Sequence, residues 1–93
     1  MHEIEIFYLK GCPYCENARR AVTELLEETP AYRSLALRWI EESEEAALAD
    51  SRDYYRVPSV FHHGDKLYEC SPFHGYEAIK EHFRSAFDRA LAA

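Results

Sequence analysis

The 93-residue sequence has no long apolar run and few basic residues. A membrane-spanning helix needs about 18 or more consecutive apolar residues, and no such stretch occurs, so we expect no contact with a membrane. Eleven Lys and Arg residues stand against 17 Asp and Glu residues, which gives a formal charge of −6. A surface with this balance does not attract phosphate backbones, and it argues against nucleic acid as a partner.

Targeting signals and paired cysteines are also lacking. The N-terminus has neither the basic start nor the small-residue cleavage site of a signal peptide, so we expect a cytoplasmic protein. Its three cysteines are an odd number and cannot form a fully paired disulfide framework. In the reducing cytosol, two closely spaced cysteines are more often catalytic or metal-binding than structural.

The apolar residues that are present predict a folded α/β chain. Neither repeats, low-complexity tracts nor a long linker divide it, so residues 1–93 are expected to form one domain. Residues 3–9 first alternate between acidic and apolar residues and then become continuously apolar, which is typical of a buried strand. Two segments have apolar residues at helical spacing and predict amphipathic helices. The first, which ends near Thr29, contains Ala18, Ala21, Val22, Leu25 and Leu26. The second, near the C-terminus, contains Ile79, Phe83, Phe87 and Leu91.

The middle of the chain predicts two further strands, a short helix and a hairpin. Residues 34–40 alternate like a strand, and Ser43, followed by two glutamates, predicts the solvated start of a helix that reaches about Asp50. Residues 58–62 and 66–70 flank a His-Gly-Asp turn and predict a hairpin. Ser71 and Pro72 are read as a helix start or a loop. The order βαβαββα predicts a four-stranded mixed sheet with helices on both faces.

The stretch GCPYC, residues 11–15, lies where the first strand meets the first helix. Unpaired backbone amides and the helix dipole favour an anion at this point, and a thiolate is such an anion. The pKa of a free cysteine, about 8.5, falls to roughly 3.5–7.5 in such settings, so we expect Cys12 to be ionised near neutrality. Cys15 follows one helical turn later, which allows Cys12 to attack a disulfide and Cys15 to release the product.

The motif and two later stretches resemble the glutaredoxins, a family of the thioredoxin fold. They are GCPYC after the first strand, VP at residues 57–58 before the third strand, and FHHG at residues 61–64 in the hairpin, in the family's order over almost the whole chain. The resemblance implies a thioredoxin-like fold and a thiol–disulfide oxidoreductase without a bound cofactor. In it, Cys12 is the nucleophile and Cys15 is the resolving cysteine.

The resemblance also implies where a substrate binds. Tyr14 would border the substrate groove, and Pro58 would follow a cis peptide bond that turns the Val57 backbone toward an extended peptide such as glutathione. Lys10 and the amide end of the last helix, near Ser71, would bind the carboxylates of this tripeptide.

One stretch departs from the family pattern. Glutaredoxins that bind glutathione carry a Gly-Gly pair before the last helix, where this chain has Tyr68 and Glu69, whose bulk and charge would crowd the γ-glutamyl end. Arg56 replaces the family's threonine and would either bind a carboxylate or pair with Glu69. We therefore expect electrons to come from glutathione as co-substrate or directly from a thioredoxin-reductase-type flavoprotein. Disulfide-containing proteins are further expected partners.

A metal-binding alternative remains beside the redox interpretation. Zinc needs about four ligands and the CxxC motif supplies two. Cys70 with His62, His63 or His74 could supply more, although no second CxxC or HxxxH spacing accompanies the motif. An iron–sulfur cluster shared between chains is implied by some relatives, so the alternative function is a metal-binding or iron–sulfur carrier module. Cys70 is expected either to fill a strand end or to act as a regulatory thiol.

Overall fold

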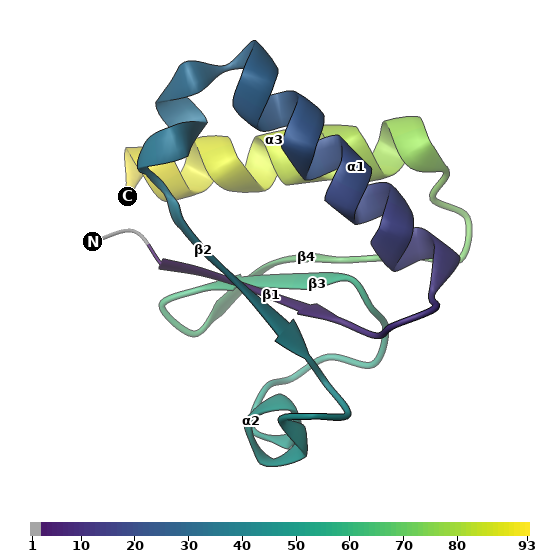
Figure 1. Ribbon diagram of the computed structural model, residues 1–93. Coiled ribbons are helices and arrows are strands. Elements are labelled where there is room, and N and C mark those ends of the chain that lie inside the picture. The colour runs from purple at the N-terminus through teal and green to yellow at the C-terminus, as the bar shows by residue number, and fades with distance from the viewer. Residues whose placement is uncertain (1–2) are drawn as a thin grey trace.

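Strands and helices alternate in the predicted order βαβαββα (Figure 1). The computed structural model describes residues 3–93. The elements are β1 (Glu3–Tyr8), α1 (Pro13–Glu28), a 3₁₀ helix (Pro30–Ser34), β2 (Ala36–Glu41), α2 (Ala46–Asp50), β3 (Ser59–His62), β4 (Asp65–Glu69) and α3 (Tyr76–Ala92). Over this described part of the chain, no helix has the length and apolar character needed to cross a membrane.

The four strands form one mixed sheet in the order β2-β1-β3-β4. The central strand β1 pairs in parallel with β2 and antiparallel with β3, and β4 completes the sheet as the hairpin partner of β3. The parallel pair follows from the crossover through α1, because two parallel strands need a long connection. The predicted sheet is therefore confirmed.

The helices lie on both faces of the sheet, as predicted (Figure 1). Helices α1 and α3 cover one face, where the residues of the two predicted apolar stripes are buried or partly buried. Phe83 and Phe87 are fully buried in this layer and meet edge to face, at 6.0 Å between ring centroids. On the other face, Ala49 of α2 packs with Phe7 and Phe61. The helical spacing in the sequence correctly identified the residues that α1 and α3 bury on the first face.

One predicted helix start differs from the structure, and one that the sequence left open is decided. Helix α2 begins at Ala46 with Glu45 as its N-cap, rather than at Ser43, because the Ser43 hydroxyl instead donates a hydrogen bond to Glu41, at 2.6 Å. Helix α3 begins at Tyr76, so of the two alternatives for Ser71 and Pro72 the loop is confirmed. In this loop the Ser71 carbonyl accepts a hydrogen bond from the backbone amide of His74, at 3.0 Å.

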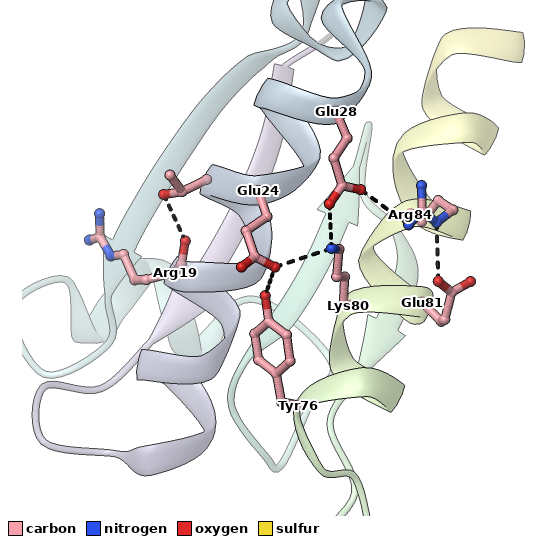
Figure 2. Close-up of polar contacts among 8 residues, drawn as sticks. Arg19, Glu24, Glu28, Tyr76, Lys80, Glu81 and Arg84 are labelled. Carbon is pink, nitrogen blue, oxygen red and sulfur yellow. Dashed lines mark hydrogen bonds and ion pairs between the residues drawn. The ribbon is translucent and has the colours of Figure 1, made fainter.

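A polar network joins α1 to α3 (Figure 2). Lys80 lies between the two helices and binds Glu24 at 3.1 Å and Glu28 at 2.7 Å. Tyr76 donates a hydrogen bond to Glu24, and Arg84 pairs with Glu28 at 3.6 Å. These contacts fix α3 against the helix whose first turn carries the CxxC motif.

Candidate active site

The CxxC motif occupies the first turn of α1. Cys12 is the N-cap residue, with φ −82° and ψ 120°, and Pro13 takes the first helical position, where its missing N–H had no helical partner. Gly11 precedes them with φ +82°, a conformation that favours glycine. The Cys12 carbonyl accepts the first helical hydrogen bond, from Glu16 at 3.0 Å. The local sequence thus places Cys12 at the N-terminus of α1.

The two cysteines of the motif differ in burial. Cys12 is half-buried, whereas Cys15 is only 3% exposed, and both are free thiols. Burial raises the pKa of Cys15 to about 12, opposed by a hydrogen bond from the Leu9 backbone amide and reinforced by the neighbouring Cys12 sulfur. Cys15 is therefore protonated near neutrality, and Cys12 is the more accessible of the two sulfurs.

Cys70 lies beside the motif, just after β4. It is 3% exposed, its backbone amide donates to the Pro58 carbonyl at 3.0 Å, and burial raises the pKa of its thiol. The Cys12 sulfur also raises the pKa of Cys70, and Cys70 in turn raises the pKa of Cys15. Among residues 3–93, no group of three His, Cys, Asp or Glu side chains is arranged to hold a metal ion. The donor set of the metal alternative is therefore not assembled there.

Three loops meet at the end of the sheet where the motif lies (Figure 1). They are the β1–α1 loop, the segment that enters β3 and the β4–α3 connection. The implied cis bond between Val57 and Pro58 is confirmed, with Pro58 buried and Val57 half-buried. Tyr14 joins the motif to the β4–α3 connection, because its hydroxyl donates to the Pro72 carbonyl at 3.0 Å.

Glu69 holds the segment that enters β3. Its carboxylate accepts hydrogen bonds from the backbone amides of Tyr55 and Arg56, both at 3.0 Å, and pairs with Lys66 at 2.8 Å. In the described residues the Arg56 guanidinium makes no ion pair with Glu69, so that alternative is wrong, and its charge instead lowers the pKa of Cys70. Whether Arg56 binds a substrate carboxylate stays a prediction.

The other expected ligand-binding residues have protein partners. The Lys10 ammonium pairs with Glu44 at 2.6 Å in an exposed ion pair, and the Ser71 amide donates to Nδ1 of His74 at 3.3 Å. The expectation that Ser71 marks the amide end of the last helix is wrong, because α3 begins at Tyr76. Exposed pairs are weak, so Lys10 can exchange Glu44 for another carboxylate. Substrate binding by Lys10 and Ser71 stays a prediction.

Tyr68, one of the two residues expected to crowd the γ-glutamyl end, is buried. Its ring is 6% exposed, meets Phe83 of α3 at 5.7 Å and stacks on His82 at 4.7 Å. Its hydroxyl bonds Nδ1 of His74 at 2.7 Å, and burial lowers the pKa of this histidine. Tyr68 therefore belongs to the packing between β4 and α3.

Glu41 is a residue of this region that the sequence pattern did not reveal. It precedes Ser43 in an acidic run that favours a solvated helix start, but it is 5% exposed. Hydrogen bonds from backbone amides and the Ser43 hydroxyl lower the pKa of Glu41 to about 2, and the largest effect comes from the Lys10 amide. The position of Glu41 at the end of the second predicted strand was one signal that could have indicated this role. In the sheet, Glu41 pairs with Tyr8 at the end of β1.

Comparison with known proteins supports the fold class. No family model matches the sequence, and no curated protein matches it. Among solved structures, one described as "Structure of a malarial protein" has a TM-score of 0.63 and 12% identity, with 92% of this chain and 97% of that chain covered. A mutant thioredoxin from Halobacterium salinarum NRC-1 has a TM-score of 0.59 and 25% identity, with 92% of this chain and 74% of that chain covered.

These findings define the class of the protein. The mixed sheet with helices on both faces is a thioredoxin-like fold, shared with a thioredoxin over 92% of the chain. It is a fold of general thiol–disulfide oxidoreductases, and in this chain two cysteines lie at the start of its first helix.

Proposed function

We propose that this protein is a glutaredoxin-like dithiol–disulfide oxidoreductase that reduces protein or glutathione mixed disulfides through Cys12 and Cys15. The observation that carries the proposal is the pair of free thiols at the start of α1, one half-buried and one buried. The thioredoxin-like fold and the cis bond before Pro58 support it.

The chemistry takes two steps. The Cys12 thiolate attacks one sulfur of a substrate disulfide, so a Cys12–substrate disulfide forms and the other sulfur leaves as a thiolate. Cys15 then loses its proton and attacks the Cys12 sulfur, which closes the Cys12–Cys15 disulfide and releases the second substrate thiolate. The substrate gains two electrons and the protein loses two.

A donor must return two electrons to the Cys12–Cys15 disulfide. We propose glutathione or a thioredoxin-reductase-type flavoprotein for this role, with no cofactor bound to the chain itself. Lys10, Tyr14, Arg56, Val57, Pro58 and Ser71 are the proposed substrate-binding residues. Two basic groups would meet a tripeptide carboxylate. They are the Lys10 ammonium, which is exposed in its ion pair with Glu44, and the guanidinium of Arg56.

The cysteine roles are tested with three matched substitutions. Cys12→Ser should abolish reduction of a glutathione mixed disulfide, because it removes the attacking sulfur. Cys15→Ser should still attack and should accumulate a mixed disulfide detectable by intact-protein mass spectrometry. Cys70→Ser is the control and should retain activity. Full activity of Cys12→Ser, or no trapped adduct with Cys15→Ser, would refute the assignment.

The donor is tested with one substrate in two parallel assays. A mixed disulfide of glutathione and a small thiol is offered with glutathione and its reductase, or with thioredoxin reductase alone. Activity with glutathione identifies a glutaredoxin in function, and activity only with the flavoprotein identifies a thioredoxin-like donor. An absence of activity in both assays would contradict the proposed function.

A further inference from the structure

We propose that His74 is a positioning residue for the turn beside the thiol motif: its neutral ring closes residues 71–74, and protonation of the ring opens them. The structural part of the inference concerns this turn alone. Its consequence for a substrate rests on the proposed function.

Three hydrogen bonds close residues 71–74 into a turn. The His74 amide donates to the Ser71 carbonyl at 3.0 Å, and Pro72 takes the second position, where turns favour proline. The Phe73 amide donates to the Ser71 hydroxyl at 3.3 Å. The third bond runs in the opposite direction, from the Ser71 amide to Nδ1 of the His74 ring, at 3.3 Å. The side chain of His74 therefore closes the turn that its own backbone ends.

The contact with Ser71 fixes the protonation state of the His74 ring. A backbone amide only donates, so Nδ1 presents its lone pair and the neutral ring carries its proton on Nε2. The Tyr68 hydroxyl, at 2.7 Å from the same nitrogen, then donates to it as well. A protonated Nδ1 can still donate to the Tyr68 oxygen, but it faces the Ser71 N–H as one donor against another. Protonation of His74 therefore breaks the contact with Ser71.

The groups packed around His74 also oppose a charge on its ring. Tyr68 of β4 stacks on it at 5.7 Å between ring centroids, and His82 of α3 stacks on it at 4.7 Å. Burial raises the pKa of Tyr68, so this neighbour is uncharged near neutrality. Burial lowers the pKa of His74, and a charge on His82 lowers it further. The surroundings thus favour the neutral ring that the turn requires.

The turn is tied to the thiol motif and to the segment that enters β3. Tyr14, which stands between the two cysteines of the motif, donates its hydroxyl to the Pro72 carbonyl at 3.0 Å. Just before the turn, the Cys70 amide donates to the Pro58 carbonyl at 3.0 Å. Pro72 lies inside the turn, so opening the turn displaces the carbonyl that Tyr14 binds.

The turn also presents Phe73 to solvent. The Phe73 side chain is 93% exposed, and aromatic side chains are enriched where proteins bind one another. A polypeptide extends on both sides of its disulfide cysteine, whereas a small symmetrical disulfide has no such extension. We therefore expect protonation of His74 to weaken attack on a polypeptide disulfide and to spare attack on a small one.

Two substitutions separate the acceptor at Nδ1 from its titration. His74→Asn places an amide oxygen near the position of Nδ1, so Ser71 and Tyr68 keep an acceptor that does not titrate. His74→Ala removes the acceptor and should leave the turn open at every pH. The matched control is His63→Asn, because His63 is an exposed histidine of the β3–β4 turn with φ 51°, a conformation that asparagine adopts readily.

The structural part is measured by NMR between about pH 5 and pH 8, where histidine changes its charge. In the parent, the His74 ring should titrate below the ordinary value of 6.5, since the folded state favours its neutral form. The bond from Ser71 is then present above pH 6.5 and lost as pH falls through the folded pKa. Protection of the Ser71 amide from exchange should fall about fivefold over that titration, the loss expected for one net hydrogen bond.

The variants should divide into three patterns. His74→Asn should keep Ser71 protected across the range, His74→Ala should leave it unprotected throughout, and His63→Asn should follow the parent. A His74 ring that titrates at or above 6.5, or a Ser71 amide whose protection in the parent does not change with pH, would overturn the inference.

The substrate part is measured with two disulfides that release the same aromatic thiolate. One joins the aromatic thiol to a peptide cysteine, and the other is the symmetrical aromatic disulfide. In both, the Cys12 thiolate attacks, a mixed disulfide with Cys12 forms and the aromatic thiolate leaves with the electron pair of the broken bond. Because the same thiolate attacks both reagents, the ratio of the two rates cancels the ionisation of Cys12.

The ratio of peptide to small-disulfide rates should fall in acid for the parent and for His63→Asn. It should stay constant for His74→Asn, whose acceptor does not titrate. A constant ratio in the parent would overturn the substrate part of the inference.

The two measurements separate this inference from the proposed function. A protein that shows the His74 titration and the loss of Ser71 protection but attacks neither disulfide would refute the function and leave the closure of the turn standing. A protein that attacks both disulfides while Ser71 protection stays independent of pH would refute the inference and leave the function standing.

Discussion

At the scale of single residues, the two sulfurs of the motif differ in burial, and this difference suits one to attack a substrate and the other to resolve the mixed disulfide. Cys12 is half-buried at the N-cap, and Cys15 lies one turn deeper with 3% exposure. Burial favours the neutral thiol and raises the pKa of Cys15 to about 12. A protonated Cys15 does not compete for substrate, and it becomes a nucleophile only when it loses its proton.

This division predicts a pH-dependent resolving step. Below a pKa of about 12, the thiolate fraction of Cys15 rises about tenfold per pH unit, so closure of the Cys12–Cys15 disulfide should accelerate steadily as pH rises through neutrality. Stopped-flow measurement of the second thiolate release, from a mixed disulfide formed beforehand on Cys12, checks this. A rate that levels off near neutral pH would show that burial does not hold the proton on Cys15.

The motif residues were predictable from the sequence, and Glu41 was not. The spacing of Cys12 and Cys15 and the position of Pro13 are local facts, fixed by one helical turn. Burial of Glu41 depends on Lys10, 31 residues away along the chain, which donates its backbone amide. A run of five residues with four glutamates looks solvated, and no local pattern distinguishes the one that turns inward.

At the scale of elements, a carboxylate at the end of each outer strand, β2 and β4, binds backbone amides of the loop next to an inner strand, β1 or β3. Glu41 ends β2 and binds the amide of Lys10, after β1. Glu69 ends β4 and binds the amides of Tyr55 and Arg56, before β3. Two carboxylates therefore fix the backbone on both sides of the motif. Both carboxylates thus accept hydrogen bonds from loop amides that strand pairing does not satisfy.

The polar network between α1 and α3 predicts a pH-dependent part of stability. Hydrogen bonds from Tyr76 and Lys80 lower the pKa of Glu24, and Lys80 also lowers the pKa of Glu28, both from 4.5. Depressed carboxylate pKa values stabilise the folded state above about pH 4.5, and this contribution is lost as pH falls through the folded values. Lys80→Met should therefore lower the urea midpoint at neutral pH, with a smaller difference from wild type in acid.

The control for this prediction is Arg38→Met. Arg38 pairs with Glu45 at 3.2 Å, with side chains 47% and 43% exposed, so its removal should change the midpoint little. If Lys80→Met behaved like Arg38→Met at neutral pH, the network of Figure 2 would not stabilise the contact between the helices.

Local periodicity explains which element boundaries could be predicted. The apolar stripes of α1 and α3 repeat over several turns, and the end of α1 before Pro30 follows from the restriction that proline places on its predecessor. The start of α3 was ambiguous because Ser71 and Pro72 suit a helix start as well as a loop. The loop is decided by non-local contacts, such as the hydrogen bond between Tyr68 and His74.

At the scale of the whole molecule, three loops from separate parts of the sequence gather at one end of the sheet (Figure 1). They bring together Cys12, the cis peptide bond at Pro58 and Cys70. The molecule has a formal charge of −6, and Arg56 is an exposed basic residue at this end. The fold class was predictable from the element order, whereas the positions of the three loops relative to one another required the sheet order β2-β1-β3-β4.

The central claim is that Cys12 and Cys15 together exchange a disulfide. The most direct measurement is peptide mapping by mass spectrometry of the wild-type protein, alkylated in acid after a single turnover with a peptide disulfide. The account predicts a Cys12–Cys15 disulfide, a free Cys70 and the peptide released in reduced form. A Cys12–Cys70 disulfide, or three unmodified thiols beside intact substrate, would contradict it.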